Sequence, residues 1–380
     1  MEAKLNRRSF MGSAMISIPA IILCVAALVH SGLHAAEGEY MVVGTQNPAY
    51  RANTVFSAPE DLTSPRFTGL VERYKLNDVV KGETDEFRRI LLLRNWLNRH
   101  IVIDQKRPAA EGDALKILEE GPKGGRYSCG HFEAAQNAVM NAMGYVTRCV
   151  LSGPDGDDPR LTGHHGSNEV WCNSLCKWVM IDAELDSHFE KDGVPLSALE
   201  IRDAYLADGA AGVARVQGLE RKPVPRGKYD QWGYTPKAYA FIGWRQQADR
   251  LTIWPKDGSS AEVVYDDEYF QTHTWYRNGR KHWAYDSGNF LRVKDRGAIY
   301  WTPNVLEVKT RIEGAAALVE IDSSTPNLKE YQMRREGGGW ERVEKSFRLS
   351  LSKPREEWRL RAVNLAGVAG PEYRLVIELK

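Results

Sequence analysis

This sequence of 380 residues contains few cysteines and carries almost no net charge. It contains five cysteines, and its 51 basic side chains nearly balance 50 acidic ones, which leaves a formal charge of +1. Neither the acidic nor the basic residues form a long run. The sequence therefore lacks the clustered basic residues that are typical of a nucleic-acid-binding protein, and we expect no nucleic-acid partner. The sequence also offers no cofactor motif, and we predict no cofactor.

The cysteines are too few for a fold held together by disulfides. One of them, Cys24, lies in an apolar N-terminal segment. The others are unevenly spaced: Cys129, Cys149, Cys172 and Cys176. Small secreted domains that depend on disulfides are much denser in cysteine. At least one of these thiols is therefore available for chemistry.

The N-terminus has the pattern of an export signal. Basic residues precede an apolar run over residues 14–29, and small residues follow at 35–36. The motif RRSFM at residues 7–11 resembles the twin-arginine signal of bacteria. We therefore predict an export signal over residues 1–36 and a periplasmic or secreted bacterial protein. The alternative is a retained inner-membrane anchor, since the run falls just short of the ~20 residues that span a bilayer; membrane contact is expected only through this segment.

The sequence after the predicted export signal predicts an α+β fold. Within residues 37–215, helical patterns over 85–100 and 112–120 are followed by a helix from Cys129 and by two strands within 168–181. Helices followed by antiparallel strands are typical of an α+β domain.

Two β-rich parts are predicted after it. Residues 216–300 are an aromatic-rich β extension, whose tryptophans and tyrosines either fill a core or form a sugar-stacking platform. Residues 301–380 alternate apolar and polar positions and resemble a fibronectin type III or immunoglobulin-like sandwich, with a final hairpin from Trp358. Such sandwiches are usually spacers or binding modules.

One cysteine begins an amphipathic helix in the stretch GRYSCGHFEAAQNAVMNAMGYVTR, residues 125–148. Apolar side chains recur every three or four residues, Ser128 can cap the helix, and Gly144 stands at its left-handed end. Cys129 therefore falls in the first turn, where the helix dipole and unpaired N–H groups stabilise a thiolate. It is a candidate nucleophile, and the alternative is a small buried hydrophobic residue.

A base for this nucleophile is available in the stretch HHGSNEVWCNSLCKWVMIDAELD, residues 164–186. His165 precedes one predicted strand and Asp182 ends the next, so a hairpin would bring them together. The neighbouring His164 is a competing base, although its side chain would point to the opposite face of an extended segment. Asp182 could also be an ordinary turn residue.

The order Cys, then H-x-x-x-E-V, then W-x-x-x-D resembles the transglutaminase-like superfamily of papain-like cysteine acyl transferases and proteases. The helix end AMGYVTR and the upstream RNWLNRHI are similar to the family as well, and the resemblance covers residues 91–186. It implies a nucleophile helix packed on an antiparallel sheet, with Cys129, His165 and Asp182 as a catalytic triad. Ser167 stands where many members carry an aromatic residue.

The resemblance implies acyl transfer through a thiol. Asp182 would orient the imidazolium of His165, which holds the proton of Cys129, and the thiolate would attack an amide carbonyl to give a thioester. The backbone N–H of Cys129 is the natural oxyanion donor. Ala183 stands in place of the family's usual proline. Together with Ser167, it indicates a substrate cleft whose shape differs from that of other members.

We therefore predict an exported cysteine-dependent hydrolase, a protease or amidase, that acts on peptides, proteins or glycopeptides of the cell envelope. Two alternatives are a non-catalytic envelope protein that binds polysaccharide or protein, and a cross-linking transglutaminase. Cys172 and Cys176 could form a disulfide, remain free, or bind zinc with a nearby histidine. Because C-x-x-x-C lacks the common zinc spacing, we predict no metal site.

Overall fold

The computed structural model describes residues 39–57, 61–154, 165–225, 235–247, 261–273, 275–277, 280–282 and 290–380. The predicted export signal and His164 lie outside these residues, as do Trp232 and Trp254 of the aromatic-rich part. Residues 39–380 form one compact unit. In the described part of the chain, no helix is long and apolar enough to cross a membrane.

Helices precede the central sheet, and the three predicted from periodicity are confirmed. They are α3 (Glu86–His100), α4 (Ala114–Glu120) and α5 (Cys129–Ala142), preceded by α1 (Pro65–Arg73) and α2 (Leu76–Val79). Asp85 and Asp113 cap α3 and α4 by accepting hydrogen bonds from backbone N–H groups of the first turn. Gly144 follows α5 at φ +82°, and a Cβ there would lie 2.5 Å from the Ala366 side chain, so glycine is required.

The central sheet has the strand order β13-β10-β9-β2-β3-β4. Its strands are β2 (Thr147–Gly153), β3 (His165–Cys172), β4 (Lys177–Ile181), β9 (Phe241–Arg245), β10 (Glu262–Tyr265) and β13 (Phe290–Val293). The predicted hairpin is confirmed, because β3 and β4 pair antiparallel from Asn168 opposite Ile181 to Cys172 opposite Lys177. β9, β10 and β13, from the predicted aromatic-rich extension, continue this same sheet.

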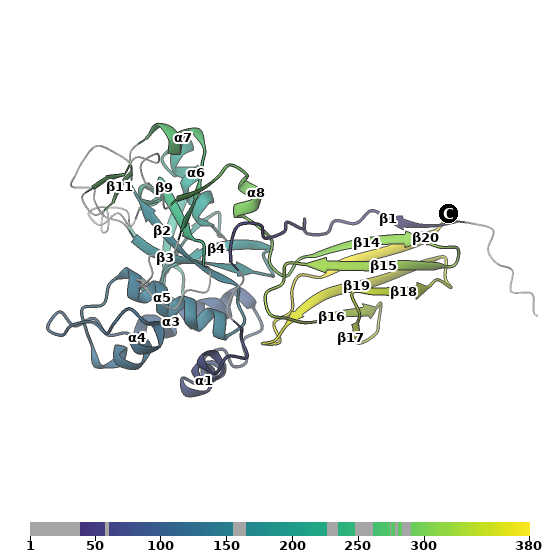
Figure 1. Cartoon of the computed structure of the whole chain (residues 1–380), viewed down its shortest axis with the longest axis horizontal. Helices are drawn as coiled ribbons and strands as arrows, with labels where there is room; N and C mark the ends of the chain where they lie inside the picture. Colours follow the sequence, from purple (N-terminus) through teal and green to yellow (C-terminus); the bar gives the residue numbers. More distant parts are fainter. Residues whose placement is uncertain are drawn as a thin grey trace, which may run out of the picture. The chain divides into compact units, whose positions relative to one another are not determined.

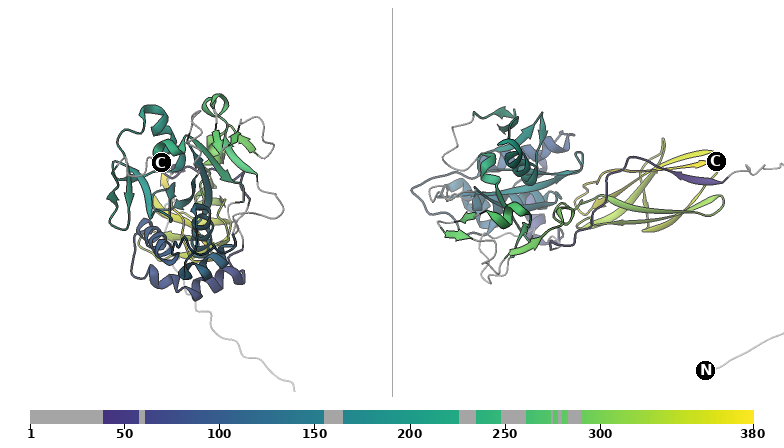
Figure 2. Two further views of the ribbon diagram at one scale, coloured as in Figure 1. Left: turned by 90° about the vertical axis from the view of Figure 1, so that its left-hand side faces the viewer. Right: turned by 90° about the horizontal axis from the view of Figure 1, so that it is seen from above.

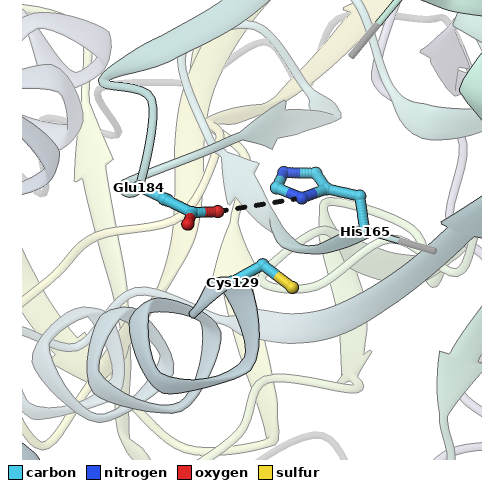
Figure 3. A group of neighbouring side chains, drawn as sticks. All are labelled: Cys129, His165 and Glu184. Atoms are coloured by element: carbon cyan, nitrogen blue, oxygen red, sulfur yellow. Dashed lines mark ion pairs between the residues drawn. The ribbon is translucent and has the colours of Figure 1, made fainter. Parts of the chain in front are cut away.

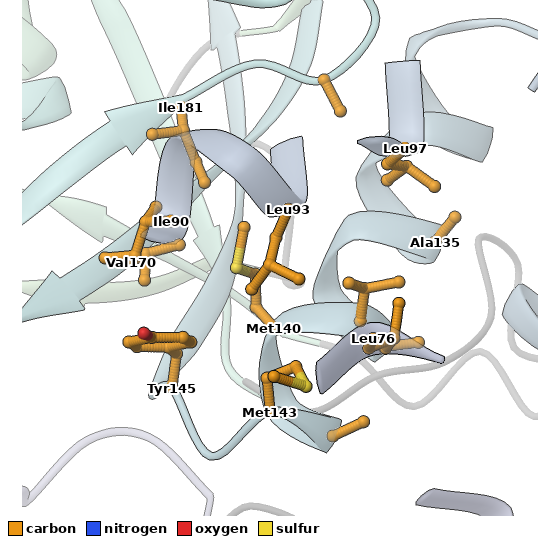
Figure 4. Close-up of a cluster of buried hydrophobic side chains, with 14 of the residues drawn as sticks. Leu76, Ile90, Leu93, Leu97, Ala135, Met140, Met143, Tyr145, Val170 and Ile181 are labelled. Carbon is orange, nitrogen blue, oxygen red and sulfur yellow. The ribbon is translucent and has the colours of Figure 1, made fainter. Parts of the chain in front are cut away.

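Side chains of the sheet alternate between two cores. In β3, Val170 and Cys172 join the core formed with α3 and α5, whereas Trp171 joins the core on the other face. Helices α3 and α5 cover the first face, and Figure 4 shows their leucines and methionines against Val170 and Ile181. The other face carries the buried side chains of Trp171, Trp178 and Trp244. It packs against α6 (Ala198–Asp208), which lies on this side of the sheet in Figure 1.

Smaller elements surround this sheet. A second antiparallel sheet has the order β6-β5-β7-β8 and contains β5 (Ser187–Lys191), β6 (Val194–Pro195), β7 (Val213–Gln217) and β8 (Lys222–Pro223). The others are η1 (Gly121–Lys123), η4 (Pro236–Tyr239), α7 (Glu268–Thr272), α8 (Arg296–Ile299) and the hairpin of β11 (Trp275–Arg277) and β12 (Arg280–His282).

The C-terminal part consists of two antiparallel sheets with a shared core, seen as two layers in Figure 2. One has the order β14-β15-β18, with β14 (Leu306–Ile312), β15 (Ala316–Ser323) and β18 (Ser346–Ser350). The other has the order β1-β20-β19-β16-β17, with β1 (Tyr40–Val43), β16 (Leu328–Arg335), β17 (Glu341–Val343), β19 (Arg355–Asn364) and β20 (Tyr373–Leu379). The chain is therefore α+β, as predicted, and its first described strand pairs with its last.

Candidate active site

Cys129 lies at the N-terminal end of α5, where the sequence places it. The preceding Ser128 is fixed by His131, whose Nδ1 lies 3.1 Å from the Ser128 backbone N and 3.0 Å from its hydroxyl. Cys129 is a free, partly exposed thiol, whereas almost all of the helix after it is buried. The first N–H groups of a helix have no partner within the helix, and they carry the positive end of its dipole. The sulfur is therefore both accessible and close to a positive potential.

His165 and Asp182 meet across the hairpin. His165 begins β3, and its Nε2 lies 2.7 Å from Oδ2 of Asp182, which directly follows β4. Both side chains are 5% exposed. Oδ1 of Asp182 accepts a hydrogen bond from the backbone N–H of Leu185 at 3.1 Å. Because Asp182 occupies Nε2, the other nitrogen of the ring, Nδ1, is left to act on a neighbouring group.

Cys129 is that neighbour. The three site residues predicted from the sequence, Cys129, His165 and Asp182, therefore lie together in the structure. The sulfur of Cys129, a ring nitrogen of His165 and a carboxylate oxygen of Glu184 all lie within 4.8 Å of one another (Figure 3). Cys129 comes from the helix, His165 from the sheet and Glu184 from the turn after β4. The side chains that the sequence separates by up to 55 positions thus converge on one point.

The charges favour an imidazolium. Burial alone lowers the pKa of His165, but the Asp182 carboxylate and the Cys129 sulfur raise it, so that it lies well above its usual value. Burial raises the pKa of Asp182, but the charge and hydrogen bond of His165, with the nearby Arg215, hold it below its usual value. A positive ring beside a thiol is the environment that stabilises a thiolate.

Helix α3 holds the turn that carries Asp182. Nδ2 of Asn98 donates to the backbone oxygens of Ala183 at 2.9 Å and Glu184 at 3.0 Å. One turn earlier on the same helix, Nε of Arg94 lies 2.8 Å from Oδ1 of Asp186, in an ion pair whose Arg94 side chain is fully buried. The acid of the site is therefore positioned by side chains of an independent element.

Glu184 belongs to the group although the sequence analysis does not single it out. Its Oε2 lies 3.9 Å from Nδ1 of His165, and the side chain is 15% exposed. Burial, followed by the charge of Asp182, raises the pKa of Glu184 to about 7. The sequence carries no periodic signal for it, because residues 183–186 form a turn and not an extended segment.

The same three atoms could hold a metal ion. Sulfur, imidazole nitrogen and carboxylate oxygen are all zinc ligands, and Asp182 would orient the histidine through its second nitrogen. The sequence predicts no metal site, and zinc was an alternative there only for Cys172 and Cys176 with a nearby histidine. Among the described residues, the group of Cys129, His165 and Glu184 is the one with suitable spacing.

The other cysteines have structural surroundings. Cys149 is buried. Cys172 and Cys176 are free thiols rather than a disulfide. Burial and the neighbouring carboxylate of Glu86 raise the pKa of Cys172 to about 12, so it remains protonated at neutral pH.

A buried ion pair supports the sheet behind the site. Nη2 of Arg148 lies 2.6 Å from Oε2 of Glu169, and neither side chain is exposed. Glu169 also accepts hydrogen bonds from Trp244 Nε1 at 2.7 Å and from the Tyr300 hydroxyl at 2.6 Å. Trp244 is therefore a core residue, as is Tyr239 at 2% exposure. These described members of the aromatic-rich part fill a core and do not form a sugar-stacking surface.

The fold and the site define an α+β domain with a cysteine, a histidine and two carboxyl groups in one cluster. Residues 74–183 match the transglutaminase-like superfamily, and they include Cys129, His165 and Asp182. The chain thus contains a transglutaminase-like core. Among solved structures, red sea bream transglutaminase is similar over 75% of this chain and 53% of its own, at 12% identity and a TM-score of 0.24. The chain spans about half the length of that protein. No curated protein matches the chain.

Proposed function

We propose that the protein is a cysteine enzyme that cleaves amide bonds through a thioester intermediate. The observation that carries this proposal is the position of His165, which has Asp182 on Nε2 and Cys129 on the side of Nδ1. The transglutaminase-like core is consistent with protease or transamidase chemistry. Hydrolysis is the reaction that we propose first.

Each step uses groups of the cluster. The Cys129 thiolate attacks the amide carbon, and backbone N–H groups at the start of α5 receive the oxyanion. The C–N bond then breaks, and the proton on Nδ1 of His165 moves to the leaving nitrogen. Water next gives a proton to Nδ1 and attacks the thioester, which releases the acid and restores the thiolate. Asp182 keeps the ring oriented and stabilises its positive charge throughout.

The substrate and the location are further parts of the proposal. The sequence of the N-terminus supports export to the bacterial periplasm or beyond, and an exported amidase would meet peptides, proteins and glycopeptides of the cell envelope. The two C-terminal sheets, which we interpret as a fibronectin type III or immunoglobulin-like sandwich, would be a spacer or would bind polysaccharide. Incubation of the protein with envelope fractions, followed by mass spectrometry, should reveal products that require Cys129.

The first test is the rate of alkylation of each cysteine by iodoacetamide as a function of pH. We expect Cys129 to react faster than Cys176 below about pH 7, since only Cys129 has an imidazolium beside it. Cys176 is an internal control, because the reagent can reach this exposed residue. Partial burial of the thiol and the charge of Glu86 raise its pKa, so it should react slowly at low pH. Replacement of Asp182 by asparagine should slow Cys129 by about tenfold or more, through loss of a hydrogen bond to a charged group. Equal rates for Cys129 and Cys176 would contradict the proposal.

A further inference from the structure

The proposed mechanism uses Cys129, His165 and Asp182, but it gives no role to Glu184. Oε2 of Glu184 is buried and accepts no hydrogen bond from the described residues. The atom lies 3.9 Å from Nδ1 of His165 (Figure 3). A buried carboxylate oxygen without a donor is costly, and a bound ion is one way in which such an atom is satisfied.

The ligand atoms of the cluster have nearly the spacing that a tetrahedral zinc ion requires. The sulfur of Cys129, a ring nitrogen of His165 and a carboxylate oxygen of Glu184 lie within 4.8 Å of one another. Atoms that bind zinc at about 2.0–2.3 Å in tetrahedral directions are roughly 3.3–3.6 Å apart. Side-chain rotations that move each atom by less than about 1 Å would therefore bring all three into bonding distance of one ion.

The chemistry of these ligands selects zinc. Thiolate and imidazole are preferred ligands of Zn²⁺, whereas Mg²⁺ and Ca²⁺ take oxygen ligands. Asp182 accepts a hydrogen bond from Nε2 of His165 at 2.7 Å, which leaves Nδ1 directed at the metal position and reproduces the carboxylate that commonly supports a zinc-binding histidine. Because Cys129 is partly exposed, a water molecule can reach the fourth position on the ion.

The charges around the ligand atoms suit a divalent cation. When zinc is bound, Cys129, Asp182 and Glu184 are anionic, and His165 is neutral. Arg215 on β7 is the further cation whose charge acts on both carboxyl groups. Three negative charges and one positive charge leave two negative charges, which Zn²⁺ neutralises. The filled site therefore avoids the cost of burying an unpaired charge.

We propose that Cys129, His165 and Glu184 form a zinc site, and that zinc reversibly inhibits the cysteine enzyme. Zn²⁺ takes the place of the proton on Nδ1 of His165, and this proton passes to solvent. The coordinated sulfur no longer attacks an amide carbon, and the ring has no proton to give to the leaving nitrogen. A chelator that removes zinc restores both groups. Zinc binding is independent of the proposed amide chemistry, whereas the inhibition rests on that proposed function.

The first test exposes the full chain to Zn²⁺ and measures the rate of iodoacetamide alkylation of each cysteine, with the sites located by mass spectrometry. Micromolar zinc should slow alkylation of Cys129 in proportion to the fraction of protein that holds the ion, because the sulfur is then bound to metal. Alkylation of Cys176 should not change, and a chelator should restore the rate at Cys129. Mg²⁺ should give no protection, since it prefers oxygen ligands.

The second test measures zinc affinity by competition with a chromogenic chelator, which does not depend on enzyme activity. Glu184→Gln should weaken the affinity by at least about tenfold, because even the loss of a residue behind the ligands costs about 10–100-fold. Asp182→Asn should cost about 10–100-fold. Glu344→Gln, a change at a side chain that is 80% exposed, should keep the wild-type affinity. Cys129→Ser should bind zinc less tightly than Glu344→Gln, because it lacks the thiolate.

The outcomes separate the zinc site from the proposed enzyme. If zinc leaves the alkylation of Cys129 unchanged while fast, Asp182-dependent alkylation persists, the zinc site is wrong and the thiolate–imidazolium pair stands. Wild-type affinity in Glu184→Gln would also overturn the site. If zinc protects Cys129 but no amide substrate yields a Cys129-dependent product, the zinc site stands and the proposed function is wrong. Should Glu184→Gln fail to fold, Glu184→Ala is measured in its place, with the same decrease expected and an unchanged affinity again counting against the site.

Discussion

Two carboxyl groups only two residues apart have opposite tendencies in this site. Asp182 has a charged partner and a backbone donor, and its pKa lies below the usual value. The buried oxygen of Glu184 accepts no hydrogen bond from the described residues, and burial, followed by the charge of Asp182, raises the pKa of Glu184 to about 7. Separate roles follow from these environments, because one acid stays ionised to hold an imidazolium and the other changes charge near neutral pH.

This difference predicts a pH-dependent stability that is specific to Glu184. In the unfolded chain Glu184 ionises near its ordinary value of 4.5, whereas the folded protein keeps it protonated up to about 7. The unfolded state therefore binds fewer protons in this range, so the contribution of Glu184 to stability is full below pH 4.5 and is lost as the pH rises through 7. The loss amounts to about 2–3 kcal/mol. The Glu184→Gln protein should not show this loss of stability, because the glutamine amide does not ionise.

Urea unfolding of both proteins measures this effect. The free energy of unfolding of Glu184→Gln relative to the wild type should increase by about 2–3 kcal/mol between about pH 5 and about pH 8.5. Glu344→Gln is the control, and its difference from the wild type should not change with pH because its side chain is in solvent. A constant difference for Glu184→Gln would show that the carboxyl ionises normally in the folded protein.

At the scale of elements, helix α3 supports the turn that carries Asp182 and Glu184. Arg94, Asn95 and Asn98 all bond the segment after β4, through Asp186 and the backbone at Ala183 and Glu184. These three side chains lie within little more than one helical turn. The turn is therefore held by a surface of α3, and the positions of Asp182 and Glu184 depend on a helix that contributes no group to the proposed reaction.

Replacement of Arg94 by leucine tests this dependence. The change leaves Asp186 as a buried carboxylate without its cation, which should lower the free energy of unfolding by about 3–5 kcal/mol. It should also slow alkylation of Cys129, because the turn that places Asp182 loosens. Arg73→Leu, which removes an exposed ion pair with Glu119, should cost under about 1 kcal/mol. Similar urea midpoints for the two variants would contradict the supporting role.

The same elements show what the sequence could predict. Helix α5 and the hairpin of β3 and β4 follow from local patterns: an apolar repeat after Ser128, and alternation on both sides of a turn. His165 and Asp182 were within reach for that reason, since both are placed by a single hairpin. Glu184 lies in an irregular turn shaped by α3, and long-range contacts of this kind leave no periodic signal. The aromatic-rich part was also ambiguous, because burial of Trp244 depends on partners far away in sequence.

At the scale of the whole molecule, the sheet behind the site is completed by distant segments. β2, β3 and β4 come from residues 147–181, but β9, β10 and β13 come from residues 241–293 and extend the same sheet. The buried pair of Arg148 and Glu169 reaches the later segments through hydrogen bonds to Trp244, the backbone of Ile299 and Tyr300. A folded unit that carries the proposed active site therefore needs residues on both sides of the predicted division near residue 216.

Two fragments put this requirement to the test. A fragment of residues 37–215 lacks β9 and Tyr300, so Glu169 loses two donors and the tryptophan-rich core on that face opens to water. A fragment of residues 44–305 keeps the whole sheet and both cores. We expect the longer fragment to unfold cooperatively in urea and to retain fast alkylation of Cys129, and the shorter one to show neither property, since a buried charge pair that loses its partners costs several kcal/mol. Cooperative unfolding of residues 37–215 would instead show that the transglutaminase-like core is stable without the later strands.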